Sequence, residues 1–198
     1  MNNTALKDIA TELDACNRQY YDLEGTMRIK VNEMLKLAEP LSEGEFWLGI
    51  PLLAKQIENR RRLCGQEAYK GGIHNFFCEG RDNCLKVLRF VKTYQQMVSK
   101  VHNNDDCYDG VKDYDYYSDD GWHDFCDYLP LRGKAVYNKV LSGKVSAKYH
   151  KEHLSDHHEA YIVSNMEERL QMWGDNIARE LVELEQPKKE EEYDFFAM

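Results

Sequence analysis

An apolar stripe in steps of three and four residues runs through the first forty residues, and it constrains the fold more than any other feature. Only Lys30 interrupts it. Its members are Leu6, Ile9, Leu13, Cys16, Tyr20, Leu23, Met27, Met34 and Leu37. This alternation places the side chains on one side of an α-helix. The stripe predicts one long helix that begins near Asn3 or Thr4 and ends at Pro40.

The same spacing returns twice further along the chain, with Glu180 as one polar member. The two stripes are Cys84, Val87, Val91, Tyr94, Val98 and Val101, then Val163, Met166, Leu170, Trp173, Ile177 and Leu184. They predict helices over about 82–102 and 156–185. Pro51 suits a first helical turn and predicts another helix that runs to Cys64.

Three long apolar stripes cannot all face water, so they should pack against each other. We therefore expect an all-α fold: a bundle of four to five helices closed by long N- and C-terminal helices. A single domain over residues 1–187 and a flexible acidic-aromatic tail over 188–198 complete the expected organisation.

Composition excludes several classes of protein. Apolar residues make up 42% of the chain and charged residues 31%, which is typical of neither a disordered nor a membrane protein. The most apolar run, residues 46–54, is less than half of a bilayer span, and the first residues do not resemble a signal peptide. We expect a cytoplasmic protein that does not contact membranes. No two of the six cysteines have the spacing of a zinc knuckle or redox motif, so reduced thiols are expected.

The negative charge is concentrated in one segment. Residues 104–128 contain nine Asp and one Lys, which accounts for most of the net charge of −9. The flanking regions 55–100 and 129–151 are basic. Because the acidic segment shows no helical period and is rich in aromatic residues, we expect an irregular insertion at about 103–128 that docks in part.

This insertion is the first candidate site, since closely spaced carboxylates can imitate a nucleic-acid backbone in a basic groove. The candidate partner-binding residues are Asp113, Asp115, Tyr116, Tyr117, Asp119, Asp120 and Trp122. The alternative is a loop that folds onto the chain's own basic helices. Asp113, Asp115, Asp119 and Asp120 could supply oxygen ligands to calcium, but the EF-hand pattern fails because Tyr117 holds a ligand position and Gly121 falls at the wrong offset.

The tail is a second candidate for partner binding. Tyr193, Phe195 and Phe196 follow three glutamates, and paired aromatics after acidic residues are typical of short docking peptides. The alternative is a frayed terminus.

A histidine cluster is the candidate metal site. On a helix, His150, His153 and His157 would share one face, which suits zinc, with Glu152 or Asp156 as a base. The alternative is a surface turn that happens to be rich in histidine.

The favoured hypothesis is a non-enzymatic interaction protein, an inhibitor or accessory factor of viral or mobile-element type. Its expected partner is a protein with a basic, nucleic-acid-handling surface, and no cofactor is expected unless the histidines hold zinc. Two alternatives stay open: a metal-dependent hydrolase that uses the histidine cluster, and a nucleic-acid-binding protein that uses regions 55–100 and 129–151. A homodimer is also compatible with the sequence.

Overall fold

The computed structural model describes residues 3–18, 24–64, 84–111, 119–154 and 162–185, and in these ranges every regular element is helical. The elements are α1 (Asn3–Arg18), α2 (Glu24–Leu37), α3 (Glu43–Cys64), α5 (Cys84–His102), α6 (Asp105–Val111), α7 (Asp119–Tyr128), the 3-10 helix η2 (Leu129–Arg132), α8 (Lys134–Leu141), α9 (Ala147–His153), α10 (Ile162–Gln171) and α11 (Gly174–Glu185). The all-α class is thereby confirmed. Among the described helices, none has the length and apolar character that crossing a membrane requires.

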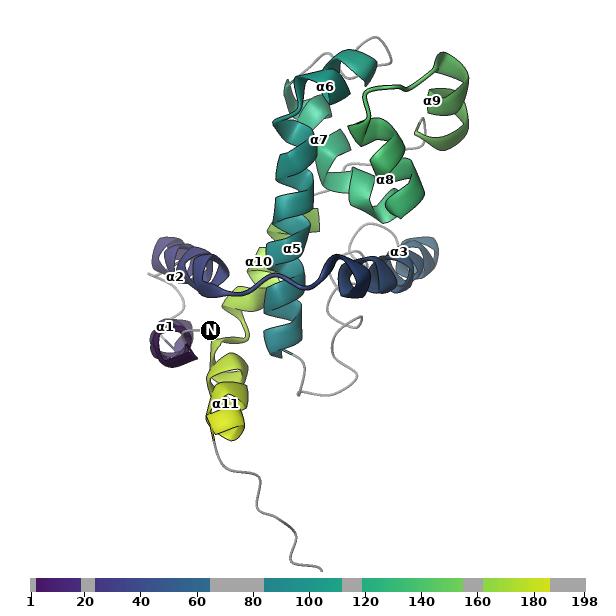
Figure 1. Cartoon of the computed structure of the whole chain (residues 1–198). Coiled ribbons are helices and arrows are strands. Elements are labelled where there is room, and N and C mark those ends of the chain that lie inside the picture. Colours follow the sequence, from purple (N-terminus) through teal and green to yellow (C-terminus); the bar gives the residue numbers. More distant parts are fainter. Residues whose placement is uncertain (1–2, 19–23, 65–83, 112–118, 155–161, 186–198) are drawn as a thin grey trace, which may run out of the picture.

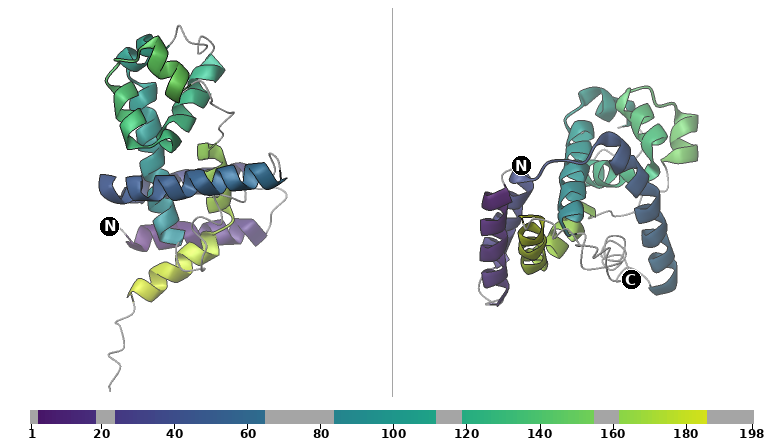
Figure 2. Two further views of the ribbon diagram at one scale, coloured as in Figure 1. Left: turned by 90° about the vertical axis from the view of Figure 1, so that its right-hand side faces the viewer. Right: turned by 60° about the horizontal axis from the view of Figure 1, so that its bottom comes forward.

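Helix α5 is the central element of the fold (Figure 1). Its buried residues lie on more than one side, and Leu88, Phe90 and Val91 are at most 1% exposed. Helices α1, α2 and α11 gather around its N-terminal half and α6, α7, η2 and α8 around its C-terminal half, with α10 beside its middle, as the views in Figures 1 and 2 show. The helix thus belongs to both groups, and α3 packs against α5 and η2 beside them.

The N-terminal stripe forms two helices, so the prediction of one helix to Pro40 is wrong. Helices α1 and α2 pack against each other. Lys30 of α2 forms ion pairs with Glu12 of α1 and, at 3.4 Å, with Glu33. The one polar member of the stripe therefore joins the two helices at the edge of their contact.

The C-terminal stripe is also divided, into α10 and α11, where one helix was expected. Trp173, at the division, stays buried. Helix α11 packs along α1, so the helices at the two ends of the described chain meet as expected. Gly174 sits at this contact, where a Cβ atom would lie 2.9 Å from Leu13 Cγ and 3.0 Å from the Ala10 carbonyl oxygen.

Helix α3 begins eight residues before the predicted start at Pro51, which lies inside the helix. Ser42 and Glu45 form a capping box that fixes the true start. The Ser42 backbone N–H donates to Glu45 Oε2 at 3.0 Å, and the Glu45 N–H donates to Ser42 Oγ at 3.3 Å. Because this capping box lies before Pro51 in the sequence, α3 begins at Glu43 and not at the proline.

The described parts of the acidic insertion are helical, which corrects the expectation of an irregular segment. Helices α6 and α7 turn their apolar side chains inward. Their buried residues are Cys107, Val111, Trp122, Phe125 and Cys126. The carboxylates are thereby mounted on packed helices.

Candidate acidic binding site

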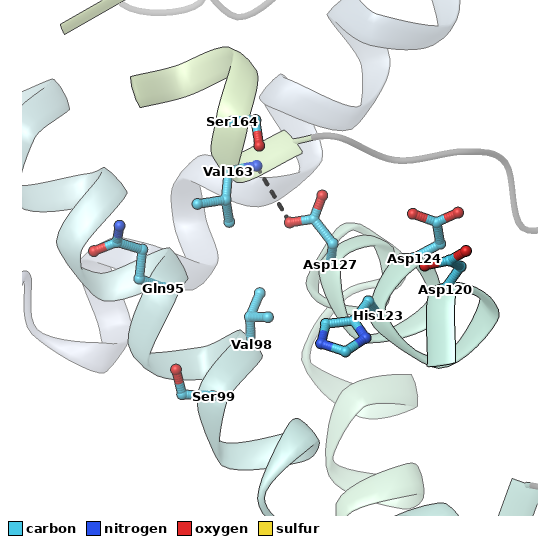
Figure 3. A pocket seen from close by; sticks show the side chains of 9 residues that line it. All are labelled: Gln95, Val98, Ser99, Asp120, His123, Asp124, Asp127, Val163 and Ser164. Carbon is cyan, nitrogen blue, oxygen red and sulfur yellow. Dashed lines mark hydrogen bonds between the residues drawn. The ribbon is translucent and has the colours of Figure 1, made fainter. Parts of the chain in front are cut away.

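An open pocket with a volume of about 770 Å³ lies between α5, α7 and α10 (Figure 3). Its lining residues are Gln95, Val98, Ser99, Asp120, His123, Asp124, Asp127, Val163 and Ser164. All three carboxylates come from α7, the C-terminal part of the acidic insertion. The fold therefore gathers negative charge at a concave surface.

The amphipathic character of α7 explains why its acids line the pocket. Trp122 and Phe125 face the core and stack with ring centroids 5.6 Å apart, and the Tyr108 ring of α6 meets Trp122 edge-on at 5.3 Å. Residues one position away on the helix, such as His123 and Asp124, must then point elsewhere. Because the aromatic face of α7 is buried in the core, its polar face is turned toward the pocket.

Asp127 anchors α7 to the start of α10. Its carboxylate accepts hydrogen bonds from the Ile162 N–H at 2.5 Å and the Val163 N–H at 3.2 Å, the latter drawn in Figure 3. These are N–H groups of a first helical turn, which have no partner within their own helix. Burial raises the pKa of Asp127 to about 6, although the two N–H donors oppose this shift. Asp127 is thus part of the pocket's frame.

Helix α5 supports the same corner from the other side. The Tyr94 hydroxyl donates to the Asp127 carbonyl oxygen at 2.7 Å, and Gln95 Nε2 donates to Glu167 Oε1 of α10 at 2.6 Å. Burial raises the pKa of Glu167 as well. Three helices are thereby held in fixed relation around the pocket.

Two histidines meet at one margin of the site. His102, the last residue of α5, and His123 of α7 place their Nε2 atoms 3.0 Å apart, with ring centroids at 4.4 Å. One nitrogen donates and the other accepts, according to the tautomers. His102 also stacks on Trp122, and His123 is exposed. Sequence reasoning missed this pair because 21 positions separate the two residues and no spaced motif contains them.

Several acids of α6 and α7 face solvent. Asp105, Asp106, Asp109 and Asp120 are exposed. Within the described ranges, Asp105, Asp106 and Asp120 form no ion pair. In the basic stretch that follows, Lys134 pairs with Glu43 of α3 at 2.9 Å instead. Among the described residues, none of these three aspartates pairs with the chain's own basic helices.

The sequence-predicted partner-binding residues divide into three groups. Asp113, Asp115, Tyr116 and Tyr117, and the tail residues Tyr193, Phe195 and Phe196, lie outside the described residues. Asp119 begins α7, and Asp120 lines the pocket. Trp122 is only 7% exposed and packs on Phe125, so it anchors α7 and is not displayed to a partner.

The predicted metal site is only partly described. His150 is buried, whereas His153 is exposed with its ring 4.4 Å from that of Tyr149. His157 lies outside the described residues. In the part of the chain that the structure describes, no three or more His, Cys, Asp or Glu side chains come together as a metal-binding group.

The basic stretch 129–151 shows its lysines but hides one of its aromatics. Lys139 and Lys148 are exposed, whereas Tyr137 is 1% exposed and its hydroxyl donates to the Met97 carbonyl oxygen at 2.8 Å. Burial raises the pKa of Tyr137. Its ring is unavailable for stacking on a base, which leaves Tyr149 and the charges for nucleic-acid contact.

Comparisons with protein-family models, with curated proteins and with solved structures find no match for this chain. The geometry of the site is therefore the basis for inferring function.

Proposed function

We propose that the chain is a non-enzymatic interaction protein whose acidic helices, α6 and α7, bind a basic surface on a protein partner. A nucleic-acid-handling protein fits best, because carboxylates would then occupy positions that phosphates take in its groove. An inhibitor or accessory role follows from such competition. The supporting observation is that Asp105, Asp106 and Asp120 are exposed, carry no ion pair within the described ranges, and stand on packed helices.

Carboxylates that stand on packed helices lose less conformational entropy on binding than carboxylates on a disordered loop would. Ordering an interface side chain costs roughly 0.5–1.5 kcal/mol, and ordering a loop adds to that cost. The burial of Trp122 and Phe125 fixes α7 before any partner arrives. Exposed carboxylates also steer a basic partner during approach, an effect that salt screens.

A charge-removal experiment tests the proposal with a defined probe, a labelled Arg/Lys-rich peptide. The test variant is Asp105→Asn with Asp120→Asn. The matched control removes the same charge from α1 and α11, through Asp8→Asn with Glu183→Gln, both of which are exposed. At low salt, we expect the test variant to bind roughly fivefold more weakly, since two exposed ion pairs at about 0.5 kcal/mol each together contribute about 1 kcal/mol.

The control variant should bind like the unchanged chain, and circular dichroism should show equal helicity in all three proteins. Equal weakening in test and control would mean that only net charge matters and would contradict the proposal. Binding of labelled duplex DNA by the chain alone, lost on Lys139→Gln with Lys148→Gln, would favour direct nucleic-acid binding instead.

A further inference from the structure

The His102–His123 pair has the geometry of two metal ligands. The two Nε2 atoms are 3.0 Å apart and come from different helices, one from the end of α5 and one from α7. Zinc–imidazole bonds are about 2.0–2.1 Å long, and a tetrahedral angle then places two ligand nitrogens about 3.3 Å apart. Opening the pair by a few tenths of an ångström would admit the ion between them.

We propose that His102 and His123 form a two-histidine site for a divalent transition metal such as Zn²⁺, with water completing the coordination. Nitrogen ligands select such ions over Ca²⁺ and Mg²⁺, which prefer oxygen. The site shares no residue with the sequence-predicted cluster His150, His153 and His157. It ties the C-terminal end of α5 to α7.

The surroundings suit a bound cation. His123 lines the same open pocket as Asp120 and Asp124, so negative charge lies nearby and water can enter. Trp122 stacks beside His102 and restricts the orientation of that ring. In the metal-free pair one Nε2 carries a proton, which must move to Nδ1 or leave when both Nε2 atoms become ligands.

The test is titration of zinc chloride into the purified chain by calorimetry, together with thermal unfolding. The test variants are His102→Gln and His123→Gln. The matched control is Lys86→Gln, an exposed change at the opposite end of α5 and outside both histidine clusters. We expect one zinc ion bound, at least tenfold weaker binding in each test variant, and unchanged binding in the control.

Zinc should also raise the Tm of the unchanged chain and of the control, but not that of either test variant. Circular dichroism identifies a variant that fails to fold, and exposed His123 makes His123→Gln the safer of the two. Zinc affinity that stays the same in folded His123→Gln would overturn the proposal. Adding EDTA to the basic-peptide assay removes zinc from it, so the outcomes of the two experiments are independent.

Discussion

At the scale of single residues, carboxylates supplied by one helix cap the start of another. Glu180 of α11 accepts hydrogen bonds from the Cys84 N–H at 2.6 Å and the Leu85 N–H at 2.9 Å. Its carboxylate thereby caps the N-terminus of α5. Asp127 does the same for α10. A helix N-terminus has unpaired N–H groups and a partial positive charge, so both contacts stabilise the fold. Glu180 is thus polar within an apolar stripe because it meets a helix end.

Asp127 should make stability depend on pH. Its pKa of about 6 in the folded chain lies above the ordinary value of 3.8, so the folded state favours the protonated form. The contribution of Asp127 to the free energy of unfolding should be fully present below about pH 4 and be lost as the pH rises to about 6, by about 3 kcal/mol at most. In Asp127→Asn this contribution is absent. Urea unfolding between pH 4 and 7 measures the difference, and parallel curves for both proteins would contradict the assignment.

Removing the cap on α5 should be costly. Glu180→Ala leaves two N–H groups without their partner and should lower the free energy of unfolding by about 1–3 kcal/mol. Glu183→Ala on the same helix, where the side chain is exposed, should change it by less than about 0.5 kcal/mol. Denaturant titration of the two variants provides the comparison. Equal losses would show that Glu180 is not a cap.

At the scale of elements, periodicity predicts which residues are buried better than it predicts where a helix ends. The helix expected over 82–102 is observed as Cys84–His102. The first stripe is observed as two helices that pack against each other, in which Leu6, Leu13, Met27 and Met34 are buried whereas Leu37 is exposed. The acidic helices were missed because their apolar residues are few: α6 buries only Cys107 and Val111, one turn apart. Two apolar residues are too few to show a helical period, so the acidic composition of the segment favoured the prediction of an irregular insertion.

The crossing of α1 and α11 requires a glycine. In Gly174→Ala the new Cβ would press on Leu13 and on the α1 backbone, which should cost about 1–3 kcal/mol. Gly44 provides the control, because a Cβ there meets nothing within 4 Å, and Gly44→Ala should be neutral or stabilising by up to about 1 kcal/mol. Thermal unfolding of the two variants distinguishes these cases. A stable Gly174→Ala would mean that the helices can separate without loss.

At the scale of the whole molecule, α5 joins two groups of helices into one structure. Its residues pack against α2 and α11 near one end, against α6, α7 and η2 toward the other, and against α10 between them. Neither group can lose α5 without exposing apolar side chains. The candidate site depends on this arrangement, since His102 and His123, or Gln95 and Glu167, are brought together only by it. Sequence spacing carries no signal for such pairs.

Because both groups of helices pack against α5, we expect them to unfold together. The destabilising change Gly174→Ala lies in the α1–α11 contact, far along the fold from α7 (Figure 1). Its loss of stability should nevertheless reduce amide-hydrogen exchange protection in α7 by the same factor as in α11. Exchange read by mass spectrometry measures both. Reduced protection confined to α1 and α11 would show that the two groups unfold separately.

The central claim is that the acidic helices are the surface that meets a basic partner. Its most direct test is an NMR titration of the isotope-labelled chain with the Arg/Lys-rich peptide at low salt. The claim predicts that the largest amide shifts map to Asp105, Asp109, Asp120 and Asp124, and that they shrink as salt is added. Shifts that map to α1 and α11, or that spread evenly over exposed acids, would contradict it.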